Sequence, residues 1–100
     1  MNRNQISSTI TCAAPELRSA GLSALYLFGS QARGDASDES DIDFAFDVAE
    51  GADERFSVID QARLQLRLEA ILGCKVDFLE RRGLRSRMRE QVEREMVRLM

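Results

Sequence analysis

A short apolar segment, residues 24–28, ends directly in a Gly-Ser pair, and this junction constrains the fold more than any other part of the sequence. Five apolar residues with glycine on both sides are typical of a buried β-strand. Gly29 allows a tight turn, and the N–H groups at the start of a following helix can bind an anion. The sequence therefore predicts a strand, a turn and one or two helical turns, with phosphate as a candidate ligand.

Acidic and apolar residues alternate at the start of the segment 41–48. In a strand this alternation places Asp41 and Asp43 on the same face. Two neighbouring carboxylates repel each other unless a cation lies between them, and hard oxygen ligands suit Mg²⁺ or Mn²⁺. A solvent-exposed edge strand would also explain this pair when it is considered alone.

A third short strand is predicted at residues 75–79, where Asp77 lies between Val76 and Phe78. A charged side chain among apolar ones is costly unless it has a partner or points to solvent. If this strand lies beside the one that carries Asp41 and Asp43, Asp77 completes an acidic triad. Otherwise Asp77 occupies an exposed position on an alternating strand.

Three segments have apolar residues at helical spacing: 4–20, 53–72 and 84–99. In the first, Pro15 predicts either a kink or a second helical start. The middle segment carries two apolar stripes, which are Ile59/Ala62/Leu66/Ala70 and Leu64/Leu68/Ile71/Leu72. Either both stripes belong to the core, or the second one meets another chain. The last segment carries the stripe Leu84, Met88, Val92, Met96 and Leu99.

These elements predict an α/β (α+β) fold in which helices and strands alternate along the chain. We expect a small mixed sheet of about three strands, with the flanking helices packed on one side and the carboxylates on the open side. With 100 residues, the chain is expected to form a single domain, residues 1–100.

Composition excludes several classes of function. The chain has no histidine, which removes a histidine general base, a Ser-His or Cys-His nucleophile pair and almost any zinc site. Cys12 and Cys74 fit neither a metal-binding spacing nor a disulfide framework, so both are interpreted as small buried residues. A net charge of -3 argues against a general nucleic-acid binder. No apolar run is long enough to span a membrane, so a cytoplasmic location is expected.

The combination of Gly29-Ser30 with Asp41-Ile42-Asp43, separated by ten residues, resembles the signature of the DNA polymerase beta-like nucleotidyltransferase superfamily. The similarity is greatest to its minimal nucleotidyltransferases and covers nearly the whole chain. The resemblance implies that Gly29 and Ser30 bind the β- and γ-phosphates of ATP, and that Arg33 assists them. It also implies that Asp41, Asp43 and Asp77 are catalytic and hold two Mg²⁺ ions, with Mn²⁺ as an alternative.

In many of these relatives the small enzyme acts as an antitoxin for a HEPN-domain RNase toxin. The resemblance therefore implies a protein adenylyltransferase that attaches AMP to a tyrosine of such a partner, as a hetero-oligomer with the partner or as a homodimer. One alternative is an antitoxin that acts by binding alone. Another is transfer to a small molecule or a tRNA. The cluster Arg81, Arg82, Arg85, Arg87 and Arg89 favours RNA, but the glutamates between these arginines are typical of a solvated helix face.

Overall fold

The structure is a computed structural model that describes residues 2–33, 41–52 and 55–100, without the side chains of Ser30 and Gln31. In chain order its elements are α1 (Arg3–Ser19), β1 (Leu22–Phe28), α2 (Ser30–Arg33), β2 (Ile42–Val48), α3 (Val58–Leu72), β3 (Val76–Glu80), the 3₁₀ helix η1 (Arg81–Gly83), α4 (Ser86–Glu95) and β4 (Val97–Arg98). Residues 35–40 have the polar composition of an exposed loop, and they lie outside the described residues.

The strands form a mixed sheet in the order β3-β2-β1-β4. β1 is antiparallel to β2 and to β4, whereas β2 and β3 are parallel. The mixed α/β architecture and the three expected strands are confirmed, and β4 is a fourth strand that was not expected. The last helix ends at Glu95 rather than near residue 99, and the chain beyond it adds the fourth strand. The N–H of Leu99 donates to the carbonyl of Leu25 at 2.8 Å, which extends this edge pairing.

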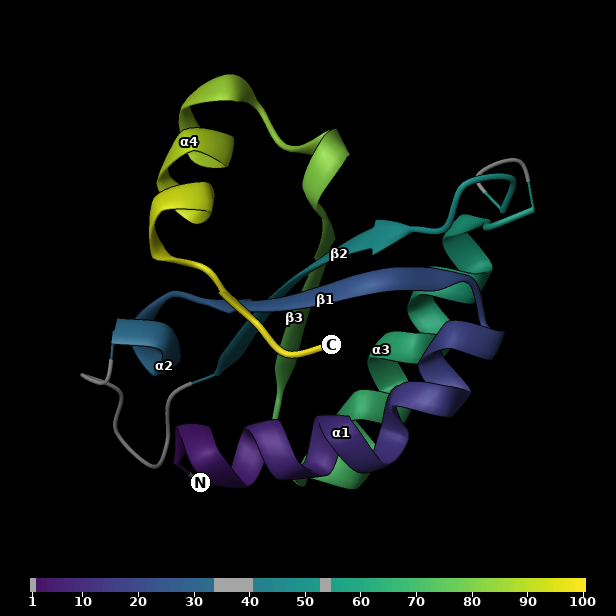
Figure 1. Cartoon of the computed structure of the whole chain (residues 1–100), viewed down its shortest axis with the longest axis horizontal. Helices are drawn as coiled ribbons and strands as arrows, with labels where there is room; N and C mark the ends of the chain where they lie inside the picture. The colour runs from purple at the N-terminus through teal and green to yellow at the C-terminus, as the bar shows by residue number, and fades with distance from the viewer. Residues whose placement is uncertain (1, 34–40, 53–54) are drawn as a thin grey trace.

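The larger part of the core lies between the sheet and the helices α1 and α3, which lie side by side below the strands in Figure 1. α1 contributes Ile6, Ile10 and Leu17, which are fully buried. Their spacing matches the helical period expected from the sequence. Pro15 lies inside this one helix, so no second helical start is present at that position.

α4 lies on the opposite face of the sheet, above the strands in Figure 1. Its buried Val92 belongs to a small cluster with Ala24, Tyr26, Phe28 and Ala45. The expectation that all helices pack on one side of the sheet was therefore wrong. The apolar stripe predicted around Val92 is present in α4, but it packs on the face of the sheet that carries the carboxylates and not against the main core.

The two apolar stripes of α3 have different environments. Leu64, Leu68 and Leu72 are buried, so this stripe is the core-facing one. Ile59 and Leu66 of the other stripe are 65% and 66% exposed. The interpretation that the Leu64/Leu68 stripe meets another chain was therefore wrong. α3 begins at Val58 instead of residue 53, because Ser57 and Asp60 form a capping box at its start.

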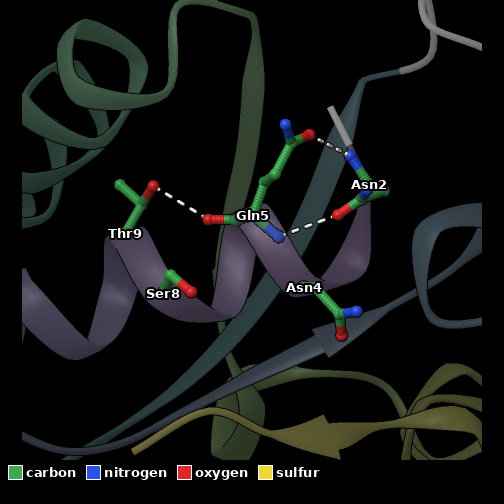
Figure 2. A pocket seen from close by; sticks show the side chains of 5 residues that line it. All are labelled: Asn2, Asn4, Gln5, Ser8 and Thr9. Carbon is green, nitrogen blue, oxygen red and sulfur yellow. Dashed lines mark hydrogen bonds between the residues drawn. The ribbon is translucent and has the colours of Figure 1, made fainter.

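The start of α1 carries a shallow polar pocket lined by Asn2, Asn4, Gln5, Ser8 and Thr9, shown in Figure 2. Asn2 and Gln5 each accept a hydrogen bond from the other's backbone N–H, at 2.9 and 2.8 Å. Thr9 donates to the carbonyl of Gln5 at 2.9 Å. These polar groups thus satisfy the helix start itself.

Two expectations drawn from composition have different outcomes. Cys74 is partly buried and packs against the core, but Cys12 is exposed on α1, so the prediction that both cysteines are buried was wrong for Cys12. No helix among the described residues is both long and apolar enough to cross a membrane.

Side chains of α3 cover the outer edge of β3. Gln65 donates to the carbonyl of Val76 and Gln61 to the carbonyl of Phe78, each at 2.9 Å. Glu69 accepts from the N–H of Val76 at 3.1 Å. The three donors and acceptors are one helical turn apart, so they form a row along the strand. This row satisfies backbone groups that an edge strand otherwise leaves unpaired.

We predict that Gln65→Met lowers the free energy of unfolding by about 1 kcal/mol, because Met keeps the length of the side chain but leaves the Val76 carbonyl without its donor. Urea denaturation followed by circular dichroism measures this change. Arg63→Met, on the exposed side of the same helix, is the control and should change stability by less than about 0.5 kcal/mol. Equal effects of the two substitutions would contradict the role given to Gln65.

Candidate active site

The sheet register places Asp43 in the centre of a short row across three strands. Asp43 on β2 lies opposite Phe28, the last residue of β1, and opposite Asp77 on β3. The conditional prediction that Asp77 joins the acidic pair required β3 to lie beside β2, and it does. The end of β1 and the starts of β2 and β3 therefore meet at one edge of the structure, directly before the turn at Gly29.

Gly29 packs against the side chain of Asp43. Its φ of +74° lies in the left-handed region, where residues with a side chain are strained. A Cβ at this position would collide with Oδ2 of Asp43 and would lie only 3.2 Å from its Cγ. Glycine is thus required both by the turn and by the carboxylate beside it.

The environment of Asp43 favours a neutral or cation-bound carboxyl group. Burial raises its pKa to about 6, and a hydrogen bond with Asp77 and the charges of Asp77 and Asp41 act in the same direction. The charge of Arg33 acts in the opposite direction. A proton shared between two acids occupies the place that a divalent cation would otherwise take, so this oxygen donor set fits Mg²⁺ or Mn²⁺.

The three predicted acids are not equally close together. Asp43 is half-buried and paired with Asp77, whereas Asp41 precedes β2 and is exposed. Asp77 is also exposed, so the pair is open to solvent on one side. Within residues 2–33, 41–52 and 55–100, no three acidic or cysteine side chains are gathered as a ready metal site.

The turn at Gly29 leads directly into α2, as the sequence predicted. The N–H of Arg33 donates to the carbonyl of Gly29 at 3.1 Å, which closes the first helical turn. Nη1 of Arg33 lies 3.1 Å from Oε2 of Glu95 at the end of α4. The backbone of Ser30 opens α2, but its side chain lies outside the described part of the chain.

A second charged group on the same face was not predicted from the sequence. Asp47 is 8% exposed, and Arg81 binds both of its oxygens, with Nε–Oδ1 at 2.9 Å and Nη2–Oδ2 at 3.1 Å. Tyr26 donates to Oδ2 of Asp47 at 2.9 Å, and Glu93 of α4 binds Nη1 of Arg81 at 2.9 Å. Arg81 was interpreted as part of a solvated helix face, yet it precedes α4 and holds this network. The hydrogen bonds to Asp47 raise the pKa of Arg81, and burial raises that of Tyr26.

The position of Asp47 in the sequence contains a signal for a partnered acid. It follows Asp43 by four residues on an alternating strand, so the two side chains share a face. A charged residue in an otherwise apolar part of a strand requires a partner. Its partner was not identifiable from the sequence, because Arg81 is 34 residues away.

Asp43 should make the stability of the metal-free protein depend on pH. Its pKa is raised in the folded state, so its contribution to stability is complete below about pH 4 and is lost as the pH rises through about 6. In EDTA, wild type should therefore lose on the order of 1 kcal/mol relative to Asp43→Asn between pH 4 and 7.5, after allowance for solvent screening. Urea unfolding at several pH values measures this difference.

Asp60 provides a control of opposite sign. Hydrogen bonds from Ser57 lower its pKa, so it stabilises the fold at neutral pH and loses this effect as the pH falls through the lowered value. Wild type should therefore gain stability relative to Asp60→Asn as the pH rises. If Asp43→Asn and wild type kept a constant difference over the whole range, the proposed environment of Asp43 would be wrong.

Comparison with known proteins places this geometry in a family. A family model described as nucleotidyltransferase domain matches residues 13–99. The protein adenylyltransferase MntA of Thermococcus cleftensis is 35% identical over 94 residues, which are 93% of this chain and 91% of that protein. Both matches include the Gly29 turn and the strands that carry Asp43 and Asp77.

Solved structures show the same fold. A toxin-antitoxin crystal structure with AMP-PNP is similar with a TM-score of 0.75 and 27% identity, over 94% of this chain and 72% of that one. An MNT antitoxin in complex with a tri-AMPylated Shewanella oneidensis HEPN toxin gives a TM-score of 0.69 at 24% identity, over 95% of this chain and 71% of that one, and this likeness concerns the fold alone. The chain therefore belongs to the nucleotidyltransferase domain family and is a nucleotidyltransferase of the minimal type.

Proposed function

We propose that this chain transfers AMP from ATP to a tyrosine of a HEPN-domain toxin and so acts as its antitoxin. The observation that carries the proposal is the packing of Gly29 against Asp43, which is itself paired with Asp77. This arrangement puts a phosphate-binding turn directly beside carboxylates that favour a cation. The relative from Thermococcus cleftensis is a protein adenylyltransferase, which supports the same activity here.

The donor nucleotide would bind at the turn between β1 and α2. Gly29 and Ser30 would present backbone N–H groups to the β- and γ-phosphates, and Arg33 would add a positive charge beside them. The toxin-antitoxin structure with AMP-PNP supports a triphosphate as the donor. Arg33 ends α2, and residues 34–40, which follow it in the sequence, lie outside the described residues.

Asp41, Asp43 and Asp77 would hold Mg²⁺, with two ions as the expected number. When bound, Mg²⁺ neutralises the charge that develops on the phosphates and on the attacking and leaving oxygens. The acceptor hydroxyl oxygen forms a bond to the α-phosphorus while the bond to pyrophosphate breaks. The hydroxyl proton passes to the carboxylate of Asp77, which is exposed and lies opposite Asp43.

The acceptor tyrosine must come from another protein. Tyr26 is the only tyrosine of the sequence, and it is 9% exposed with its hydroxyl bound to Asp47. It therefore cannot approach the α-phosphate without disrupting the core. The toxin-antitoxin structure with AMP-PNP, which is 27% identical to this chain, supports a toxin as the partner. We propose that the chain works as a single domain of residues 1–100 in the cytoplasm.

Inhibition by binding alone is a second candidate, since Val58, Ile59 and Leu66 form an exposed apolar surface on α3. The two candidates separate in a growth test with the cognate toxin. If the chain acts as a transferase, Asp43→Asn should lose protection against the toxin, and Ile59→Asp/Leu66→Asp should retain it. Binding alone predicts the reverse order of effects on protection. Leu64 and Leu68 are unsuitable for this test because they belong to the core.

The activity itself is tested by incubating the chain with its HEPN-domain partner, Mg²⁺ and ATP labelled at the α-phosphate. We expect labelled partner from wild type, and at least a 100-fold lower rate from Asp43→Asn, because that substitution removes the charge of a cation ligand. Glu50→Gln, an exposed residue beyond the other end of β2, is the control and should retain the wild-type rate. Equal labelling by wild type and Asp43→Asn would contradict the mechanism.

Gly29→Ala should reduce transfer about 100-fold, because its Cβ displaces the Asp43 carboxylate from the phosphate turn. Gly51→Ala provides a matched control, since Gly51 also has a positive φ of +85° but has no atom within 4 Å of the added Cβ. Both variants carry similar backbone strain, and only the first disturbs the site. Rates from single-turnover assays and melting temperatures should be measured together. A similar loss of activity in both variants would show that strain alone is responsible.

A further inference from the structure

The end of α4 contacts the arginine that follows the phosphate turn, although the two are 62 residues apart. Glu95 is the last residue of α4, and its Oε2 lies 3.1 Å from Nη1 of Arg33. The glutamate side chain is 25% exposed and the arginine side chain 45% exposed. Glu95 is therefore the more firmly enclosed member of this pair.

α4 is fixed on the sheet independently of Arg33. Val92 is buried against β1 and β2, and Glu93 binds Arg81, which in turn holds the buried Asp47. Glu95 follows Glu93 by two residues, and β4 begins directly after the helix and pairs with β1. The backbone at Glu95 is thus held from both sides.

A carboxylate on a fixed backbone can restrict the side chain of Arg33. This arginine ends a helix of four residues, and its side chain has many rotamers that must be restricted before the guanidinium can hold a phosphate. The N–H of Arg33 donates to the carbonyl of Gly29, and Gly29 packs against Asp43, so Arg33 lies within one helical turn of the acidic pair. A guanidinium has five N–H donors, so it can bind a carboxylate and a phosphate oxygen at the same time.

We propose that Glu95 is a positioning residue of the donor site, which holds Arg33 beside the phosphate turn and thereby increases affinity for the triphosphate. This inference rests on the proposed role of Arg33 in the donor site. It makes the C-terminal helix part of the nucleotide site, although α4 contributes no residue of the signature motif. Glu95 acts through Arg33 and does not itself contact the nucleotide.

The test is a double-mutant cycle in which the Kd of a fluorescent ATP analogue is measured with Mg²⁺ and without any acceptor. Glu95→Ala should raise the Kd about threefold to fivefold, which corresponds to the loss of one partly exposed ion pair. Arg33→Ala should raise it at least as much. The double variant should bind no more weakly than Arg33→Ala, because Glu95 acts only through that arginine. Glu95→Gln, which keeps an oxygen acceptor, should lie between wild type and Glu95→Ala.

Glu90→Ala, an exposed glutamate of the same helix, is the control and should leave the Kd unchanged. Melting temperatures of all variants show whether α4 remains in place. A lower Kd in Glu95→Ala would show that Glu95 competes with the phosphates. Additive effects of Glu95→Ala and Arg33→Ala on the Kd would show that Glu95 acts without Arg33. Either result overturns the proposal. An unchanged Kd in Arg33→Ala overturns it together with the role of Arg33. Failure of AMP transfer to the partner leaves this binding cycle intact, so the two proposals fail separately.

Discussion

The carboxylate of Asp43 occupies the space beside Gly29, and the geometry of the site depends on this contact. The glycine has no Cβ to displace the acid, and the acid lies where the chain turns from β1 into α2. The N–H groups proposed to bind phosphate and the oxygens proposed to bind a cation are thereby held next to each other, on elements whose spacing is set by the β1–β2 pairing. A longer side chain at position 29 would separate the two halves of the site even if the fold survived.

The position of Asp77 depends on β3 and, through the contacts of β3, on α3. Parallel pairing with β2 sets Asp77 opposite Asp43, and the row of Gln61, Gln65 and Glu69 binds the other edge of the strand. β3 is therefore bound along both edges, although it is the last strand of the sheet. Hydrogen bonding along both edges suits a strand that holds one charged side chain at a defined distance from another. The polar row of α3, beside its core-facing stripe, thus contributes to the position of an acid on the opposite face of the sheet.

The sequence was sufficient for the parts of the fold that have strong local patterns. The strand before Gly29, the alternating strand with Asp43 and the periodic helices all follow from local spacing, and the structure contains them. The two-residue strand β4 was missed because no period is visible over two residues, and the apolar stripe of α4 continued into it. The side on which α4 packs was also missed, since periodicity shows that a helix has an apolar face but not which surface it covers. Arg81 and Glu95 find partners 34 and 62 residues away, and local patterns contain no information on such pairs.

The two aspartates that share one face of β2 show how a structural acid differs from one with a proposed functional role. Asp47 is nearly buried, and a guanidinium and a tyrosine hydroxyl satisfy both of its oxygens. Asp43 instead lies among acids, and their charges together with burial raise its pKa to about 6. A buried carboxylate that has an arginine on both oxygens gains nothing from a metal ion, whereas one that is surrounded by other carboxylates gains a great deal. The strand therefore uses the same residue type twice: once to fasten α4 to the sheet through Arg81, and once in the proposed cation site.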